Sequence, residues 1–150
     1  MRHKRFEYST SVRWTRGRQG TIRAPERPEL TFASPPEFGG EGGMWTPEDF
    51  FVAAVNTCTM TTFIALAERE GLDVASYDCD AEGVLEYQDG YQFTRVALRP
   101  LIEINDEQQL DLAKRLIEKA HDRCLIANSI RADVLLEPAI SVAEPATAAV

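Results

Sequence analysis

The sequence contains little of what metal centres and disulfide-built scaffolds require. Three cysteines and two histidines are spread over 150 residues, whereas a structural zinc site needs four such ligands at short spacings. An odd number of cysteines without a Cys-x-x-Cys motif is also untypical of secreted disulfide proteins. The sequence therefore predicts no metal and no cofactor, and it indicates a reducing, cytoplasmic environment.

An excess of basic residues is also missing. The 16 lysines and arginines are outnumbered by 24 aspartates and glutamates, which leaves a net charge of −8. Nucleic acids and anionic membranes attract concentrated positive charge, so neither is expected as a partner. The sequence also lacks the Gly-x-Ser-x-Gly motif that marks many hydrolases.

Long apolar runs are absent too. No apolar segment follows the basic residues 1–5, so we expect no signal peptide. The most apolar stretch, residues 50–66, contains an asparagine and four threonines, and it is too short and too polar to span a membrane comfortably. Length and composition predict one domain over residues 1–142, followed by a disordered tail over residues 143–150.

Alternation of apolar and polar residues predicts several strands. In the first, Phe6, Tyr8, Val12 and Trp14 fall on one face of a half-buried strand. Turns that contain glycine join the first and second strands, and the fourth and fifth, into hairpins. The expected strands cover residues 6–14, 21–24, 30–33, 74–87, 93–104 and 132–140.

Two helices are expected between these strands. Residues 46–49, Thr-Pro-Glu-Asp, provide a capping threonine, a first-turn proline and acids at the positive end of the helix dipole. Gly71 is placed to end this helix, which is apolar nearly all round and should be buried on several sides, with a subunit partner covering part of it. The second helix, residues 107–123, is amphipathic. The fold class is α+β, with antiparallel sheets packed around the long first helix.

A loop over residues 34–45 carries four glycines in five positions, Gly39-Gly40-Glu41-Gly42-Gly43. Such a run could resemble a phosphate cradle, but no Gly-Lys-Ser or Gly-Lys-Thr follows it. The alternative is a flexible loop that lets the backbone pass close to another group. The second interpretation is favoured.

Two cysteines occupy unusual positions. Cys58 lies deep inside the first helix, and Cys124 lies where the second helix ends, so only the fold can bring them together. If they meet, the natural chemistry is a thiolate that reacts with an oxidant and is then resolved by its partner. If they do not meet, both are small buried hydrophobic residues. Cys79 alternates with apolar residues on a strand and is expected to serve in packing.

A reactive Cys58 needs help from elsewhere in the molecule. A free thiol is only a few per cent ionised at neutral pH, and Cys58 lies about three turns from the start of its helix, beyond the reach of the helix dipole. Glu48 precedes it by ten positions, about 15 Å along a helix. If both serve one site, Glu48 must come from the same helix of a neighbouring subunit. His121, near Cys124, is either a base or a partner of the helix dipole.

These segments together resemble the OsmC/Ohr family of osmotically inducible and organic hydroperoxide resistance proteins. The residues that carry the resemblance are Pro36-Glu37-Phe38-Gly39-Gly40-Glu41-Gly42-Gly43, Thr46-Pro47-Glu48-Asp49-Phe50-Phe51-Val52-Ala53-Ala54 with Cys58, Cys124 with Asn128-Ser129, and Gly17-Arg18-Gln19-Gly20. The resemblance covers nearly the whole chain, and it implies an OsmC-like fold in an intertwined homodimer.

The resemblance also implies a function, because the characterised members are thiol-dependent peroxidases that reduce organic hydroperoxides. It implies that Cys58 is the peroxidatic thiolate, which becomes a sulfenic acid, and that Cys124 resolves it as a disulfide. Arg18 would hold the thiolate and polarise the peroxide, and Glu48 would orient Arg18. A dithiol reductant, either a lipoylated or a thioredoxin-like protein, would restore the thiols.

The sequence departs from the family pattern after both cysteines. Thr59 and Thr61 make the turn after Cys58 more polar than is usual. The catalytic branches usually have proline directly after the second cysteine and serine two residues further on, whereas this chain has Leu125 and Ala127. The chain is therefore closer to the OsmC-like proteins than to the characterised peroxidases. A non-catalytic dimer that binds a small apolar or thiol-bearing ligand and a redox sensor remain alternatives. Arg16 and Arg23 remain alternatives to Arg18.

Overall fold

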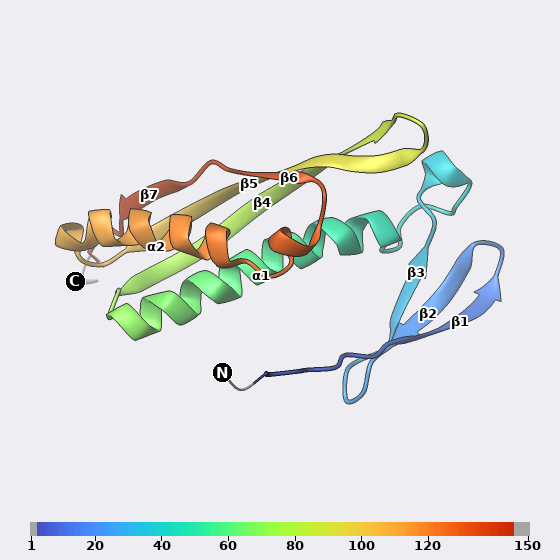
Figure 1. Cartoon of the computed structure of the whole chain (residues 1–150), viewed down its shortest axis with the longest axis horizontal. Coiled ribbons are helices and arrows are strands. Elements are labelled where there is room, and N and C mark those ends of the chain that lie inside the picture. The colour runs from blue at the N-terminus through green and yellow to red at the C-terminus, as the bar shows by residue number, and fades with distance from the viewer. Residues whose placement is uncertain (1–2, 146–150) are drawn as a thin grey trace, which may run out of the picture. The chain divides into compact units, whose positions relative to one another are not determined.

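The computed structural model describes residues 3–145, and the chain divides into two compact units, Met1–Phe51 and Val52–Val150 (Figure 1). One domain over residues 1–142 stays a prediction. In chain order the strands and helices are β1 (Ser11–Arg16), β2 (Gln19–Arg23), β3 (Leu30–Ala33), α1 (Pro47–Glu70), β4 (Val74–Tyr87), β5 (Tyr91–Ile104), α2 (Leu110–Arg123), β6 (Asp133–Leu136) and β7 (Ala139–Val142). Short 3-10 turns cover Pro36–Phe38, Glu107–Gln109 and Ala127–Ser129.

The first unit contains an antiparallel sheet in the order β1-β2-β3. The third strand has the predicted bounds, but the first begins at Ser11 and not at Phe6. All six residues of β1 are exposed, and so are Phe6 and Tyr8 before it. The prediction of a half-buried strand over residues 6–14 is therefore wrong, because alternation marks the apolar face of a strand but does not supply the surface that covers it.

The glycine-rich loop, residues 34–45, folds back on β3. The Ala33 N–H donates to the Trp45 carbonyl at 2.9 Å. A Cβ atom on Gly40 would lie 1.6 Å from the carbonyl oxygen of Ser34. Only glycine fits this close approach of two backbone segments. The sequence predicted such an approach when the segment was interpreted as a loop whose backbone passes close to another group.

Helix α1 begins and ends where the sequence predicted. The Asp49 N–H donates to Thr46 Oγ1 and the Thr46 N–H donates to Asp49 Oδ2, both at 3.0 Å, which makes a reciprocal capping box. At the other end Gly71 has a φ of 70°, and the Leu72 N–H donates to the Ala67 carbonyl at 2.9 Å. This is a Schellman ending, so both ends of α1 are determined by local sequence.

Threonines inside α1 satisfy their hydroxyls within the helix. Thr57 donates to the Ala53 carbonyl at 2.8 Å, and the buried Thr59 donates to the Val55 carbonyl at 3.0 Å. Such bonds to the preceding turn let a threonine occupy an apolar environment. By length and composition alone α1 could cross a membrane, and 28% of its most apolar stretch is buried. Most residues of that stretch therefore keep some exposed surface.

The second unit contains a sheet in the order β4-β5-β6, with β7 also paired to β5. The long β4–β5 hairpin is antiparallel as predicted, but β6 and β7 both run parallel to β5. This corrects the expectation of antiparallel pairing throughout. After β5 the chain passes through α2 before it returns, and such a crossover is the connection that parallel strands need. Pro138, which has no N–H for a ladder, divides the predicted strand over residues 132–140 in two.

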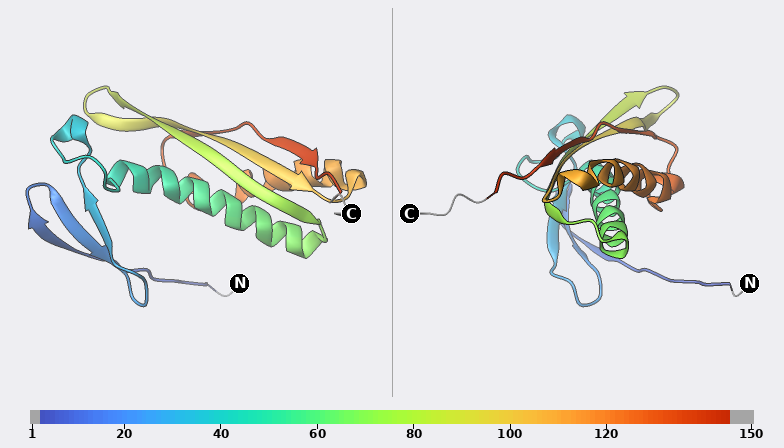
Figure 2. Two further views of the ribbon diagram at one scale, coloured as in Figure 1. Left: turned by 180° about the vertical axis from the view of Figure 1, so that it is seen from behind. Right: turned by 90° about the vertical axis from the view of Figure 1, so that its left-hand side faces the viewer.

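Helices α1 and α2 lie on one face of this second sheet (Figure 2). The side chains that were predicted to share one face of β5, Val96, Leu98, Ile102 and Ile104, are all buried. The core between the helices and the sheet consists of Phe63, Leu66, Ala67, Leu72, Ile102, Ile104, Ala113, Leu116, Ile117 and Ala120. The α+β class is confirmed, with the helices layered on a sheet.

Two boundaries at the C-terminal side differ from the predictions. Helix α2 begins at Leu110 and not at Glu107, because a 3-10 turn capped by Asp106 precedes it. The Ala143 N–H still donates to the Ile104 carbonyl at 2.8 Å, so the strand pairing continues one residue past the predicted domain end. Residues 146–150 of the predicted tail lie outside the described residues.

Gly83 on β4 should not tolerate a side chain. A Cβ atom there would lie 2.6 Å from Val52 Cγ2 and 2.9 Å from the Phe93 ring. Because overpacking of a core typically costs about 1–3 kcal/mol, we expect Gly83→Ala to lower the free energy of unfolding by this amount in urea denaturation. Gly42→Ala is the control, because its Cβ would meet nothing closer than 3.9 Å. Equal stability of the two variants would contradict the prediction.

Candidate functional site

The second unit brings together two of the predicted site residues. Cys58 lies half-buried in the middle of α1, and Cys124 lies fully buried at the C-terminal end of α2. The Ala127 N–H donates to the Cys124 sulfur at 3.5 Å. The Cys124 side chain is in turn within hydrogen-bonding reach of the Cys58 sulfur. The fold thus brings the two thiols close together, which local sequence alone could not do.

The pKa of Cys58 reflects two opposing influences. Burial is the largest single one and raises the pKa, because the charged thiolate loses contact with water. Hydrogen bonds to the sulfur lower it, and they come from the Ile126 N–H, the Cys124 side chain, the Thr62 hydroxyl and the Leu125 N–H. The hydrogen bonds prevail, and the pKa of Cys58 lies below its ordinary value of 9.0. The thiolate is the reactive form, so this environment favours reaction.

The Thr62 hydroxyl has two possible acceptors at Cys58. It donates to the Cys58 carbonyl at 2.8 Å, and it also lies within reach of the sulfur. A hydroxyl has one proton to donate, so it must rotate away from the carbonyl before it can stabilise a thiolate. Thr61 donates to the same carbonyl at 3.1 Å, which leaves this carbonyl bonded when Thr62 turns.

The donors that surround Cys58 were not predicted from the sequence. Arg18, the cation that the resemblance implied, is not among the groups that lower the pKa of Cys58; these are neutral donors at Ile126, Cys124, Thr62 and Leu125. The spacing of Thr62, four residues after Cys58 on a helix, is a signal that could have indicated a contact. The backbone donors carry no such signal, because every residue except proline has an N–H.

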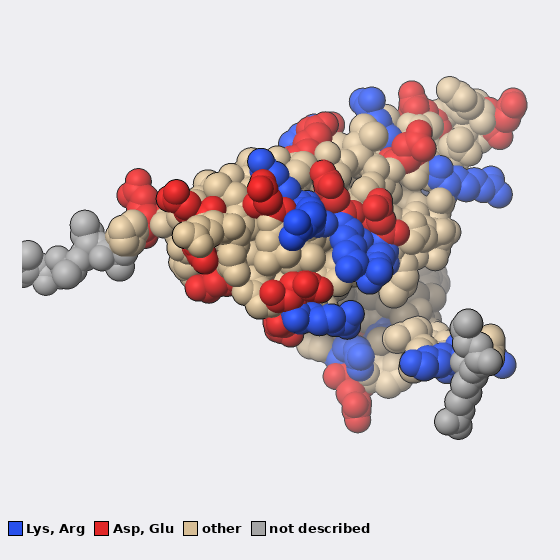
Figure 3. Space-filling view, turned by 60° about the vertical axis from the view of Figure 1, so that its left-hand side comes forward, with Lys and Arg blue, Asp and Glu red and all other residues tan. Residues whose placement is uncertain are grey.

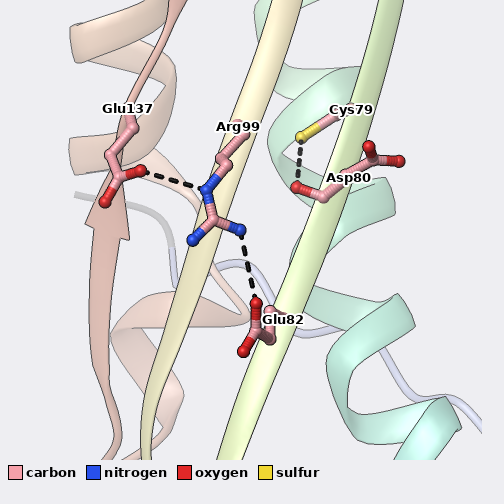
Figure 4. A network of polar contacts seen from close by, with 5 residues as sticks. All are labelled: Cys79, Asp80, Glu82, Arg99 and Glu137. Carbon is pink, nitrogen blue, oxygen red and sulfur yellow. Dashed lines mark hydrogen bonds and ion pairs between the residues drawn. The ribbon is translucent and has the colours of Figure 1, made fainter.

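Cys79 shows the opposite behaviour on β4. Burial has the largest effect and raises its pKa, the nearby charge of Asp80 acts in the same direction, and the pKa of Cys79 lies above 9.0. Its thiol faces the Asp80 carbonyl at 3.6 Å, and the guanidinium of Arg99 is held by Glu82 and Glu137 (Figure 4). This cysteine therefore stays a thiol, in agreement with the predicted role in packing.

The three candidate arginines all lie in the first unit, and two of them have acidic partners. Arg16 Nη2 lies 3.6 Å from a carboxylate oxygen of Glu41, and Arg23 Nε lies 3.4 Å from one of Glu29. An ion pair reduces the charge that an arginine can offer to another group. Arg16 and Arg23 are therefore less suited than Arg18 to act on a thiolate or a peroxide.

Arg18 is held by the glycine-rich loop. Its Nη1 donates to the Phe38 carbonyl, and a Cβ atom on Gly39 would lie 3.0 Å from this nitrogen, so the guanidinium rests against a residue without a side chain. Within residues 3–145 it forms no ion pair, with Glu48 or with any other carboxylate. Among the described residues, Arg18 thus differs from Arg16 and Arg23 in having no carboxylate partner.

Glu48 lies in the first turn of α1 but does not cap the helix, since Asp49 provides the capping carboxylate. One carboxylate oxygen of Glu48, Oε2, is buried and has no hydrogen-bond partner among the described residues. A buried acceptor without a donor is unfavourable by about 1–3 kcal/mol. The carboxylate is therefore suited to receive a donor such as a guanidinium.

The remaining polar groups do not add to a site. His121 lies in the last turn of α2, as a dipole partner would, and it is not among the groups that hydrogen-bond to Cys58. Within residues 3–145 no group of three or more His, Cys, Asp or Glu side chains could hold a metal ion. On the face drawn in Figure 3, basic and acidic side chains are interspersed, so this face offers no wide basic area.

Residues 40–138 match the family model described as OsmC-like protein. The chain belongs to the OsmC-like family. This match covers more than half of the chain, including Cys58, Cys124 and Glu48, and it confirms the resemblance inferred from the sequence. Arg18 lies outside the matched segment.

Individual relatives agree with this family. The uncharacterized protein YmaD of Bacillus subtilis strain 168 is 29% identical over 112 residues, which are 72% of this chain and 75% of that protein. An OsmC-like protein of unknown function from Vibrio cholerae superposes with a TM-score of 0.82 at 26% identity, over 90% of this chain and 100% of that chain. An organic hydroperoxide resistance protein OsmC from Legionella pneumophila shares the fold, with a TM-score of 0.67 at 24% identity, over 95% and 100% of the two chains.

The pKa difference between Cys58 and Cys79 predicts selective alkylation. At pH 8 we expect iodoacetamide to modify Cys58 before Cys79, because only the thiolate reacts and the two pKa values lie on opposite sides of 9.0. The midpoint of the rise in rate with pH should lie below pH 9.0 for Cys58 and above pH 9.0 for Cys79. Peptide mass spectrometry over a pH series measures both rates. Earlier modification of Cys79 would contradict the prediction.

Proposed function

We propose that the protein is a thiol-dependent peroxidase that reduces organic hydroperoxides. One observation carries this proposal: the Cys58 and Cys124 side chains lie within hydrogen-bonding reach inside one unit, and the pKa of Cys58 is lowered. A thiol that only packs in a core has no need of donors around its sulfur, and Cys79 on β4 of the same unit shows how such a thiol behaves. Membership of a family that includes proteins named for organic hydroperoxide resistance supports the proposal.

The proposed reaction proceeds in three balanced steps. The Cys58 thiolate attacks one peroxide oxygen, the O–O bond breaks, and the leaving alkoxide takes up a proton to give an alcohol and a Cys58 sulfenic acid. The Cys124 sulfur then attacks the Cys58 sulfur, a disulfide forms, and water leaves. A dithiol reductant supplies two electrons and two protons through a mixed disulfide and restores both thiols.

The surroundings of Cys58 support an organic substrate. Leu125, whose N–H hydrogen-bonds to the Cys58 sulfur, has a side chain that is 67% exposed. An apolar side chain beside the reacting sulfur favours a peroxide with an organic group over hydrogen peroxide, because its burial under an apolar group is favourable.

We propose that a second copy of the chain completes the site. Arg18 would approach the Cys58 thiolate, and Glu48 of the second copy would receive one edge of the guanidinium, a geometry in which arginine binds two acceptors at once. The buried Glu48 oxygen without a donor supports this arrangement. The apolar stretch of α1, of which 28% is buried in one chain, supports a homodimer.

The burial of the two thiols supports a particular route for the reductant. Cys124 is fully buried, whereas Cys58 keeps some exposed surface. An attacking thiolate needs access to the sulfur, so the reductant would attack Cys58, and Cys124 would leave. The reductant is a dithiol of the lipoylated or thioredoxin-like kind, and the proposed place of action is the cytoplasm, where such donors keep thiols reduced.

Oxidation by a stoichiometric amount of cumene hydroperoxide tests the central step. We expect the intact mass of each chain to fall by two hydrogens as the Cys58–Cys124 disulfide forms. Cys58→Ser should show no such loss. Cys124→Ser should instead retain a sulfenic acid that dimedone traps, because the resolving sulfur is missing.

The same experiment separates the alternatives. An unchanged mass with all three thiols intact would exclude the peroxidase and leave the ligand-binding dimer. A disulfide that forms once, without repeated turnover in the presence of dihydrolipoamide or a thioredoxin system, would favour the redox sensor. Cys79→Ser is the matched control, and it should oxidise and turn over like the unmodified protein.

Replacement of the candidate arginines tests the proposed role of Arg18. We expect Arg18→Gln to lower the second-order rate constant of Cys58 oxidation about a hundredfold, as the loss of one electrostatic donor does in other active sites. Arg23→Gln should leave the rate unchanged, because Glu29 already engages that guanidinium. Stopped-flow tryptophan fluorescence or competition with a reference peroxidase gives these constants. Equal rates for the two variants would remove Arg18 from the mechanism.

A further inference from the structure

We propose that Glu41 is a positioning residue that holds the turn bearing Arg18. The inference rests on the proposed function for its catalytic consequence, but its structural part stands on contacts within the first unit. Glu41 is the only acidic residue in the glycine-rich segment 39–43, and the proposed reaction does not otherwise use it.

The contacts of Glu41 converge on one carboxylate oxygen. Gln19 Nε2 donates to Glu41 Oε2 at 2.6 Å, and Arg16 Nη2 lies 3.6 Å from the same oxygen. Arg16 is the last residue of β1 and Gln19 is the first of β2. The carboxylate therefore connects the glycine-rich loop to both residues that flank the two-residue turn, Gly17 and Arg18.

The backbone of the turn is held by other groups. The Trp14 indole N–H donates to the Gly17 carbonyl at 2.9 Å, and the Ser34 N–H donates to the Arg18 carbonyl at 3.1 Å. These bonds fix the path of the chain but leave the side chains on either side of the turn free to rotate. Glu41 restrains those side chains, so it completes the fixation of the turn relative to the loop.

The position of the Arg18 side chain depends on the same loop. Its guanidinium donates to the Phe38 carbonyl and lies against Gly39. The turn and the loop enclose a hollow of about 350 Å³, lined by Arg18, Gly40 and Glu41 among others. If the loop moves away from the turn, the Phe38 carbonyl moves with it and Arg18 loses its present orientation. Beside Arg18 itself, Glu41 is the side chain that connects these two segments.

Glu41 also balances positive charge beside the turn. Without it, neither Arg16 nor Arg18 would have a carboxylate partner among the described residues. Like charges repel, so the two guanidinium groups would favour orientations away from each other. Pairing with Glu41 neutralises Arg16, and the cation of Arg18 remains available.

The test compares Glu41→Ala with Glu41→Gln and with the matched control Glu29→Ala. Glu41→Ala removes both contacts, and Glu41→Gln keeps an acceptor for Gln19 but loses the charge. Glu29→Ala removes an ion pair with Arg23 of similar length elsewhere on the same sheet. Amide hydrogen exchange over residues 16–19 reports the order of the turn. The second-order rate constant of Cys58 oxidation reports its consequence.

We expect faster exchange of the turn in Glu41→Ala and a decrease of about three- to tenfold in the rate constant, because a positioned group loses efficiency when its support is removed. Glu41→Gln should fall between, and Glu29→Ala should match the unmodified protein in both measurements. The melting temperature should stay unchanged, since exposed ion pairs contribute little to stability. In an Arg18→Gln background, Glu41→Ala should produce no further decrease in rate.

Two outcomes would overturn the inference. One is an unchanged exchange rate of the turn in Glu41→Ala, and the other is an equal loss of rate in the presence and absence of Arg18. The failure of the proposed function is a different result: Arg18→Gln alone would then oxidise at the normal rate. The exchange measurement still decides in that case whether Glu41 holds the turn.

Discussion

The hydrogen bonds to the Cys58 sulfur are the interaction on which the proposed site depends. Burial alone would hold this cysteine as a neutral thiol, as it does for Cys79. The chain after α2 returns to the middle of α1 and presents the N–H groups of Leu125 and Ile126 to the sulfur. Of the groups that lower the pKa of Cys58, the Ile126 N–H has the largest effect. A hydrogen bond to a charged acceptor is stronger in a partly dry site than in water, so part of the lowered pKa comes from the path of the backbone.

The hydrogen bonds to the Cys58 sulfur explain one effect of the departure of this chain from the sequence pattern of the catalytic branches. A proline directly after Cys124 would have no N–H, whereas Leu125 provides one that reaches the Cys58 sulfur. The leucine also places an exposed apolar side chain beside the thiol pair. The substitution that separates the chain from the characterised peroxidases therefore adds a donor to the thiolate and does not remove one. On these contacts it does not argue against thiol chemistry.

The parts of the molecule that sequence predicted well are those that local sequence determines. The ends of α1 follow from Thr46, Asp49 and Gly71, and the buried face of β5 follows from its alternation. The parallel pairing of β6 and β7, the exposed β1 and the donors around Cys58 depend on segments far apart in the chain. No local pattern encodes those contacts. Cys58 and Cys124 could be proposed as a pair only by resemblance, and their proximity required the fold.

The two units divide the proposed chemistry between them. The thiols and the donors that lower the pKa of Cys58 all belong to the second unit, and Arg18, Glu41 and Glu48 belong to the first. Formation of a disulfide needs only the second set, whereas rapid cleavage of a peroxide bond also needs a cation that stabilises the leaving oxygen. In the proposed mechanism, a protein with the first set impaired would still be oxidised, but slowly. The arginine turn would then set the rate of peroxide cleavage, whereas the formation and reduction of the disulfide would depend on the cysteines.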